Sequence, residues 1–270
     1  MKKITAIILS LVLALGLLAG CGNKTGDNKT IVVAASPTPH AEILEIAKQE
    51  LEKEGYTLVI KKFNDYVVPN TATEDGEVDA NYFQHQPYLT TFNAEQGTHL
   101  VAVASIHYEP FGIYEGTKNA IANLADGDKI AIPNDGSNRA RALLLLEAQG
   151  IIDLKDGVGV EATVLDIESY AVEVEIIEME AAQIANVRDS VALAVINGNY
   201  ALAAGLNAGT DAIATEDAAS VAAQTYANIL VVKEGNENSE KIQALVKALT
   251  SDAVKEFINS TYEGAVVPIF

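Results

Sequence analysis

The chain has 270 residues, a formal net charge of −19 and a hydrophobic content of 49%. This length supports one large domain or two smaller lobes, and the hydrophobic content excludes wholesale disorder. The acidic balance argues against nucleic acid or an anionic membrane face as a partner, because both repel an acidic surface. The single Cys excludes an internal disulfide and a Cys-based metal site, and the four His show no metal-binding spacing. We expect no metal and no cofactor.

The N-terminus has the features of a targeting segment. Three residues that include Lys2 and Lys3 precede an apolar run over residues 4–18, and small residues lead to Cys21. The apolar run is too short for a membrane span. Residues 1–20 resemble a bacterial lipoprotein signal peptide with the lipid on Cys21; a secretory signal with an incidental Cys is the alternative. Residues 21–29 are polar and contain Gly, which predicts a flexible tether. We expect a lipid-anchored protein on the extracytoplasmic face of the cell membrane.

The mature chain opens with a β-α-β pattern. Residues 30–35 are β-branched and apolar, which predicts a buried strand. Apolar side chains fall on one helical face over residues 40–51, and residues 56–62 predict a second strand. The two strands should therefore be parallel, with a right-handed crossover. Residues 63–70 read as a loop after the second strand.

An aromatic segment follows at residues 78–89, in a chain that is only 6% aromatic. Its rings alternate with polar amides, which a plain core strand would avoid. The pattern predicts a short strand ending in a loop that opens a helix, and open α/β sheets place ligand sites at such points. A pocket and a packed core both remain open on this local pattern. The rings belong to Tyr82, Phe83, His85 and Tyr88.

The rest of the chain continues as α/β units, with a shift in composition near residues 110–112. Further predicted strands cover residues 100–106, 111–114, 128–133, 162–166, 174–180, 191–196 and 226–232. Predicted helices cover residues 88–96, 139–149, 180–187, 200–206, 239–249 and 251–258. The last strand resembles the first part of the chain, so we predict two lobes: residues 30–110 with 227–270, and residues 111–226. Two lobes joined by more than one crossing make a hinge and a cleft. A single α/β domain is the alternative.

Catalytic motifs are weak in this sequence. It contains no nucleophile elbow, no Walker loop and no GxGxxG after a strand. His85 could form a base dyad with Asp79 or Asp65, but no nucleophile lies in the same segment. We therefore favour a ligand-contact role for His85 and predict that the protein is not an enzyme.

Signals for binding a charged ligand are stronger. Arg139 and Arg141 follow a polar turn, residues 134–138, at the start of a predicted helix. A helix terminus with an Arg can hold a carboxylate in two parallel hydrogen bonds. Asn197 ends a buried strand and Asn228 interrupts another, and a buried amide needs partners. The alternatives are solvated Arg side chains, a turn Asn at 197 and a sheet-edge Asn at 228.

Several segments together resemble one family, the methionine-binding lipoproteins of ABC importers, which includes the NlpA-type lipoproteins. The resemblance spans almost the whole mature chain, and the segment DANYFQHQPYL is its most specific part. Departures from the family pattern concern mainly loops of the second lobe, including the Ala-rich stretch 218–223. The matching segments are residues 36–44, 65–70, 79–89, 131–152, 180–183, 195–206, 226–232 and 262–270.

The resemblance implies a two-lobed periplasmic-binding-protein fold with a ligand cleft between the lobes. It implies that Arg141, rather than Arg139, binds a ligand carboxylate, and that Asn197 and Asn228 flank the amino acid backbone. It also implies an ABC permease and its ATPase as partners. An aromatic cage for the methionine thioether would consist of Tyr66, Phe83, His85 and Tyr88.

Other functions stay open beside this one. The ligand could be L-methionine, D-methionine, another apolar amino acid or a methionine-containing dipeptide. An extracytoplasmic enzyme with His85 as base, or an adhesin with an incidental cleft, are the alternatives from other functional classes.

Overall fold

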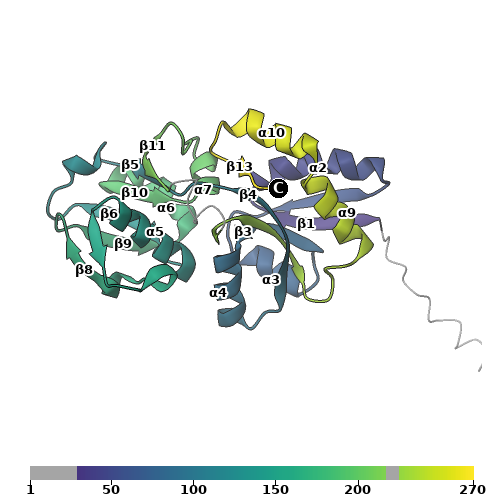
Figure 1. Ribbon diagram of the computed structural model, residues 1–270, viewed down its shortest axis with the longest axis horizontal. Coiled ribbons are helices and arrows are strands. Elements are labelled where there is room, and N and C mark those ends of the chain that lie inside the picture. The colour runs from purple at the N-terminus through teal and green to yellow at the C-terminus, as the bar shows by residue number, and fades with distance from the viewer. Residues whose placement is uncertain (1–28, 217–224) are drawn as a thin grey trace, which may run out of the picture.

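The structure is a computed structural model that describes residues 29–216 and 225–270. The expected signal peptide, Cys21, most of the tether and the Ala-rich stretch 218–223 lie outside the described residues. Two sheets, each with its own helices, form two lobes (Figure 1). Within residues 29–216 and 225–270, no helix is both long and apolar enough to cross a membrane.

Lobe 1 is built on a six-stranded sheet with the order β13-β4-β12-β3-β1-β2. The strand β1 runs parallel to β2 and β3, as the β-α-β pattern predicts, whereas β12 is antiparallel to β3 and β4. The strands are β1 (Thr30–Ala35), β2 (Thr57–Lys62), β3 (Ala80–His85), β4 (Leu100–Tyr108), β12 (Asn228–Lys233) and β13 (Val267–Pro268). The helices are α2 (His40–Lys53), α3 (Val68–Glu74), α4 (Gln86–Gln96), α9 (Glu240–Leu249) and α10 (Asp252–Tyr262).

The core of lobe 1 joins both ends of the described chain. Helix α2 buries Ile43, Leu44, Ala47 and Leu51, whose spacing places them on one helical face. These residues share one apolar cluster with α9, α10 and the inner face of β1. Because β12 lies between β3 and β4, lobe 1 needs the returning C-terminal segment to complete its sheet.

Lobe 2 is built on a five-stranded sheet with the order β11-β5-β10-β6-β9 and a separate pair, β7 and β8. The strands are β5 (Gly112–Glu115), β6 (Lys129–Pro133), β7 (Ile152–Leu154), β8 (Ile167–Tyr170), β9 (Glu175–Met179), β10 (Leu193–Ile196) and β11 (Ala212–Thr215). The helices are α5 (Gly136–Ala148), α6 (Ala181–Val187) and α7 (Gly198–Ala203). Short 3-10 turns are η1 (Ile121–Asn123), η2 (Gly159–Glu161), η3 (Val164–Asp166) and η4 (Arg188–Ser190).

The chain crosses from lobe 1 to lobe 2 between β4 and β5 and returns between β11 and β12. Figure 1 shows the two lobes side by side, with the long strand β4 leading toward lobe 2. The predicted class, a two-lobed α/β fold, is confirmed, and the alternative of a single α/β domain is not observed.

Two of the predicted elements are wrong. Residues 63–70 are not all loop, because α3 begins at Val68; the Asp65 carboxylate accepts the N–H groups of Val67 and Val68 at 2.8 Å each. Pro69 fits this first turn because its missing N–H needs no partner there. Residues 162–166 form no strand, since Thr163 and Asp166 close a capping box around η3.

Candidate ligand-binding site

A pocket lined by residues of both lobes lies between the lobes. A second hollow shares Tyr66 and Tyr88 with it. The structure brings all seven binding residues predicted from the sequence to the wall of the first pocket, the cavity between the lobes: Tyr66, Phe83, His85, Tyr88, Arg141, Asn197 and Asn228.

One end of the cavity is aromatic. The ring centroids of Tyr66 and Phe83 lie 5.6 Å apart, those of Tyr66 and Tyr88 lie 5.5 Å apart, and those of Phe83 and Tyr88 lie 6.0 Å apart. Strand β3 passes directly into α4, and His85 caps that helix by accepting the N–H of Tyr88 at 3.3 Å through Nδ1. The strand-to-helix junction therefore fixes Phe83, His85 and Tyr88 as one group.

The protonation of His85 follows from its partners. Since Nδ1 accepts a hydrogen bond, Nε2 carries the proton and donates to Asn138 Oδ1 at 3.1 Å. Burial, with the positive charge of Arg141 nearby, lowers the pKa of His85 to about 3. The ring is therefore neutral at physiological pH.

A chain of hydrogen bonds orients the amide of Asn197. The Asp135 carboxylate accepts Nδ2 of Asn138 at 2.9 and 3.1 Å, which turns Asn138 Oδ1 toward the cavity. Asn138 Oδ1 in turn accepts Nδ2 of Asn197 at 2.9 Å. Asn197 is buried, and its Oδ1 has no hydrogen-bond partner among the described residues. A buried acceptor without a partner is costly, so this oxygen points to a donor on a ligand.

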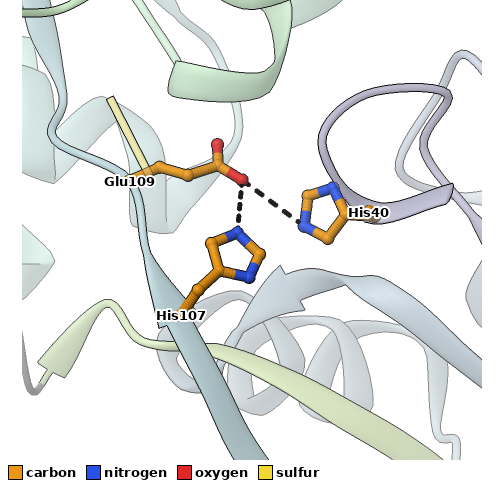
Figure 2. A group of neighbouring side chains, drawn as sticks. All are labelled: His40, His107 and Glu109. Carbon is orange, nitrogen blue, oxygen red and sulfur yellow. Dashed lines mark hydrogen bonds and ion pairs between the residues drawn. The ribbon is translucent and has the colours of Figure 1, made fainter. Parts of the chain in front are cut away.

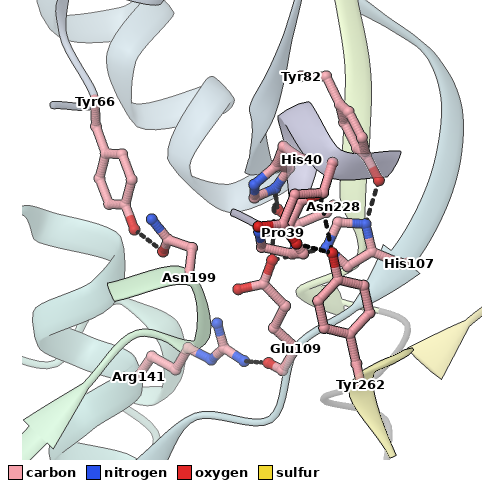
Figure 3. Close-up of polar contacts among 11 residues, drawn as sticks. Pro39, His40, Tyr66, Tyr82, His107, Glu109, Arg141, Asn199, Asn228 and Tyr262 are labelled. Atoms are coloured by element: carbon pink, nitrogen blue, oxygen red, sulfur yellow. Dashed lines mark hydrogen bonds and ion pairs between the residues drawn. The ribbon is translucent and has the colours of Figure 1, made fainter. Parts of the chain in front are cut away.

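A buried carboxylate, Glu109, lies at the chain crossing after β4. Its Oε1 accepts the Nε2–H of His107 at 2.7 Å and lies 3.5 Å from Nε2 of His40 (Figure 2). His107 is held by the hydroxyl of Tyr82, which donates to Nδ1 (Figure 3). Burial lowers the pKa of His107 to about 3 and is the main cause that lowers the pKa of His40 to about 4. Burial raises the pKa of the Glu109 carboxyl.

His40 also sets the orientation of Asn228. Its Nε2 lies 2.9 Å from Asn228 Oδ1, so the amide oxygen is engaged and the amide N–H groups are left for other acceptors. Asn228 is the first residue of β12 rather than an interruption within a strand.

The ring nitrogens of His40 and His107 and a Glu109 oxygen lie within 4.8 Å of one another, a donor set that could hold a divalent ion. Both imidazoles, however, direct a protonated Nε2 at an acceptor, and a metal would have to displace both protons. Hydrogen bonding alone thus accounts for the positions of His40, His107 and Glu109. The absence of a metal stays a prediction.

Arg141 carries the positive charge of the cavity wall. It does not lie in the first turn of its helix, because α5 begins at Gly136 with Asp135 as its N-cap. Its Nε and Nη2 donate to the two oxygens of Glu216 at 2.8 and 2.6 Å. The two parallel hydrogen bonds expected for a ligand carboxylate are therefore already made to a side chain. Burial opposes the charged form, but pairing with Glu216 raises the pKa of Arg141 above its ordinary value.

Direct contacts cross the cleft and hold the lobes together. Tyr66 in lobe 1 donates its hydroxyl to Asn199 Oδ1 in lobe 2 at 2.5 Å, and Figure 3 shows this pair beside the Glu109 network. Tyr200 donates to the carbonyl of Asn64 at 3.1 Å. The structure therefore represents a closed arrangement of the lobes.

The sequence prediction missed five residues of the cavity wall: Gln84, Glu109, Asn138, Gly198 and Asn199. Asn138 lies in the polar turn, residues 134–138, that precedes the predicted helix, and Asn199 is two residues from Asn197. Glu109 gave no signal beyond its position at the shift in composition, because a single acidic residue in an acidic chain is not distinctive.

Comparison with known proteins places the chain among lipoproteins of similar length. It is 41% identical to the methionine-binding lipoprotein MetQ of Bacillus subtilis over 276 residues, which cover 100% of this chain and 99% of that protein. The fold matches a crystal structure of a lipoprotein from Ruminococcus gnavus with a TM-score of 0.89 and 62% identity, over 90% of this chain and 100% of the other.

A nutrient-binding protein from Burkholderia cenocepacia, solved with methionine bound, matches with a TM-score of 0.84 and 42% identity, over 89% of this chain and 100% of the other. The family model of the NlpA lipoproteins matches residues 31–270. The resemblance found in the sequence motifs is thereby confirmed: the chain belongs to the NlpA lipoprotein family.

Proposed function

We propose that this protein is an extracytoplasmic substrate-binding lipoprotein that captures methionine between its lobes and delivers it to an ABC permease. The observation that carries the proposal is the division of one cavity between the lobes into an aromatic end and an end with fixed charges. A zwitterionic amino acid with an apolar side chain has the matching division. Relatives with the name methionine-binding lipoprotein, at similar length and about 40% identity, support the same ligand.

At the polar end, the proposed contacts follow from which atoms are already engaged. Arg141 and the amide N–H groups of Asn228 are donors, so they take the α-carboxylate. Glu109 and the unpartnered Oδ1 of Asn197 are acceptors, so they take the α-ammonium. Asn197 and Asn228 then flank the amino acid backbone with opposite roles. An ammonium would also compensate the buried Glu109 carboxylate, whose charged form burial disfavours.

At the aromatic end, Tyr66, Phe83 and Tyr88 would surround the side chain, with the neutral ring of His85 beside them. A polarizable thioether sulfur gains about 0.3–1.5 kcal/mol from a contact with an aromatic ring. His85 is expected to act as a ligand contact and not as a catalytic base, because its pKa of about 3 makes it a poor proton acceptor at neutral pH.

Capture rather than reaction is the proposed activity, in keeping with relatives named as binding proteins. The predicted lobes, residues 30–110 with 227–270 and residues 111–226, would close over the ligand. We further propose a lipid anchor on Cys21 at the extracytoplasmic face of the cell membrane, and a permease with its ATPase as partners. Replacing Cys21 with Ser should move the protein from the membrane fraction to the soluble fraction. Unchanged fractionation would contradict a lipid anchor on Cys21.

The proposal is tested with the chain from residue 22 onward, unfolded, dialysed free of ligand and refolded. Melting temperature is then recorded against L-methionine, D-methionine, leucine and methionine dipeptides. A ligand that binds only the folded state, present at about 100 times its Kd, adds about 2.7 kcal/mol to the free energy of unfolding. We expect the largest shift with methionine.

The panel also separates the alternatives. A larger shift with leucine would assign the cleft to another apolar amino acid, and a larger shift with a dipeptide would assign it to a methionine peptide. No shift with any of them would contradict the binding function.

A further inference from the structure

Arg141 has most of its hydrogen-bonding capacity engaged inside the protein. An arginine has five N–H donors. One on Nε and one on Nη2 bind Glu216, and the second on Nη2 binds the backbone carbonyl of Glu109 at 3.1 Å. Among the described residues, no hydrogen-bond partner is found for Nη1. The side chain is only 5% exposed and lines the cavity, so the two N–H groups of Nη1 are the ones left for a ligand.

Glu216 is held as firmly as the arginine that it binds. Its Oε2 accepts the hydroxyl of Tyr108 at 2.8 Å and the N–H of Phe111 at 3.2 Å, in addition to Arg141. Tyr108 ends β4 in lobe 1 and Phe111 precedes β5 in lobe 2, so the carboxylate bridges the chain crossing between the lobes. The cavity is lined by Arg141 and not by Glu216, which places this carboxylate behind the guanidinium.

Aromatic rings restrict the guanidinium further. Its central carbon lies 4.2 Å from the ring centroid of Tyr226 and 4.9 Å from that of Phe111. Such contacts over a ring face are attractive for a guanidinium and hold its plane. With one edge on Glu216 and its faces against rings, the group cannot turn its Nε–Nη2 edge toward the cavity without breaking the contacts with Glu216.

We infer that Glu216 is a positioning residue that fixes Arg141 so that a ligand carboxylate is bound through Nη1. This inference rests on the proposed function for the identity of the ligand. Because Glu216 occupies Nε and Nη2, the ligand carboxylate cannot form two parallel hydrogen bonds with these atoms. Glu216 also connects the carboxylate-binding arginine to the chain crossing between the lobes. The competing possibility is that Glu216 occupies a place that the ligand carboxylate takes over, in which case removing its charge would strengthen binding.

The experiment compares wild type with Glu216→Gln, using methionine and methionine amide, which lacks the carboxylate. If Glu216 acts through Arg141 on the carboxylate, Glu216→Gln should weaken the binding of methionine about tenfold or more and the binding of methionine amide by less than about threefold. Isothermal titration measures both affinities. Glu178→Gln is the matched control, because Glu178 pairs with the neighbouring Arg139 on the same helix and outside the cavity. The Glu178→Gln variant should bind both ligands with wild-type affinity.

Equal losses for both ligands would overturn the inference in favour of general structural damage. Tighter methionine binding by Glu216→Gln would overturn it in favour of competition.

A readout that needs no ligand separates this inference from the proposed function. In ¹⁵N spectra of the ligand-free protein, the Nε–H of Arg141 should exchange slowly with solvent in wild type and rapidly in Glu216→Gln. Should wild type fail to bind methionine, slow exchange lost in the variant would still support the positioning role, and equal exchange in both would overturn it.

Discussion

The two ends of the cavity are built in different ways. The aromatic end draws three of its four rings, those of Phe83, His85 and Tyr88, from six consecutive residues at one strand-to-helix junction, and only Tyr66 comes from another segment. The polar end joins residues far apart in the sequence: Arg141 and Glu216 are 75 positions apart, and His40 and Asn228 are 188 positions apart. Local chain geometry therefore shapes the apolar end, whereas the complete tertiary fold is needed to assemble the polar one.

The energetics of the two ends differ in the same way. Ring contacts are worth little individually and tolerate adjustment, so the aromatic end should lose affinity in small steps. At the polar end, charges and amides are paired, and removing one partner leaves the other without its hydrogen bonds. This costs several times more free energy than the loss of a ring contact. Substitutions at the polar end should therefore cost more in affinity and in stability.

The largest effect is expected for Arg141→Ala. It removes the proposed carboxylate contact and leaves the partly buried Glu216 without its counter-charge, so binding should be abolished and stability should fall by about 3–5 kcal/mol. Titration calorimetry and urea unfolding measure the two effects. Adding Glu216→Gln should restore part of the stability and none of the binding. Arg139→Ala, on the same helix, is the control and should bind like wild type. If Arg141→Ala kept the wild-type affinity for methionine, the polar end would not bind the ligand through a charge.

Acid should destabilise the protein through its buried imidazoles. His40, His85 and His107 have pKa values of about 4, 3 and 3 when folded, against about 6.5 when unfolded. The unfolded chain therefore binds more protons below pH ~6.5, and the free energy of unfolding falls as the pH drops from there toward 3–4. Each imidazole contributes a slope of up to about 1.4 kcal/mol per pH unit. Burial raises the pKa of Glu109 and of Asp135, which acts in the opposite direction, but this involves two protons against three.

Urea unfolding between pH 7 and pH 4 measures this slope. His107→Gln should reduce it by about one proton, and His99→Gln, at an exposed position, is the control. A slope that His107→Gln leaves unchanged would show that this imidazole is not neutral and buried as described.

A smaller effect is expected for Gly198→Ala. An added Cβ would lie 2.6 Å from Cβ and 2.7 Å from Oε2 of Glu109, so the proposed ammonium acceptor must move. Overpacking of this kind costs about 1–3 kcal/mol, and methionine affinity should fall with it. Gly136→Ala is the matched control, because its Cβ would meet only Thr91 Cγ2 at 3.6 Å. Wild-type affinity in Gly198→Ala would argue that the position of Glu109 is immaterial to the ligand.

The smallest effect is expected at the aromatic end. Phe83→Leu keeps an apolar wall but removes one ring, so the preference for methionine over norleucine should fall by about 0.3–1.5 kcal/mol. Norleucine replaces the sulfur with a methylene and therefore isolates the sulfur contact. Competition titrations with the two ligands measure this preference. A preference that is unchanged in the variant would place the sulfur away from Phe83.

The contrast between the two ends also explains how much could be predicted from the sequence. The β-α-β opening, the two lobes and the ring-bearing segment follow from local patterns, and the family resemblance singled out Arg141. Glu109 and Glu216 gave no local signal, because their roles depend on partners brought together by the fold. The start of α5 at Gly136 was missed because Gly and Ser are poor helix formers, and the Asp135 cap overrides that preference. Thr163 and Val164 have strand-forming preferences, but the capping box prevails.

The most direct test of the central claim is titration of ligand-free wild type with methionine and two capped derivatives, methionine amide and N-acetylmethionine. One cap removes the carboxylate and the other removes the ammonium, while both keep the thioether. If Arg141 and Glu109 bind the two charges, methionine should bind and each derivative should bind at least about tenfold more weakly, a loss of about 1.4 kcal/mol or more. A capped derivative that binds as tightly as methionine would contradict the account of the polar end.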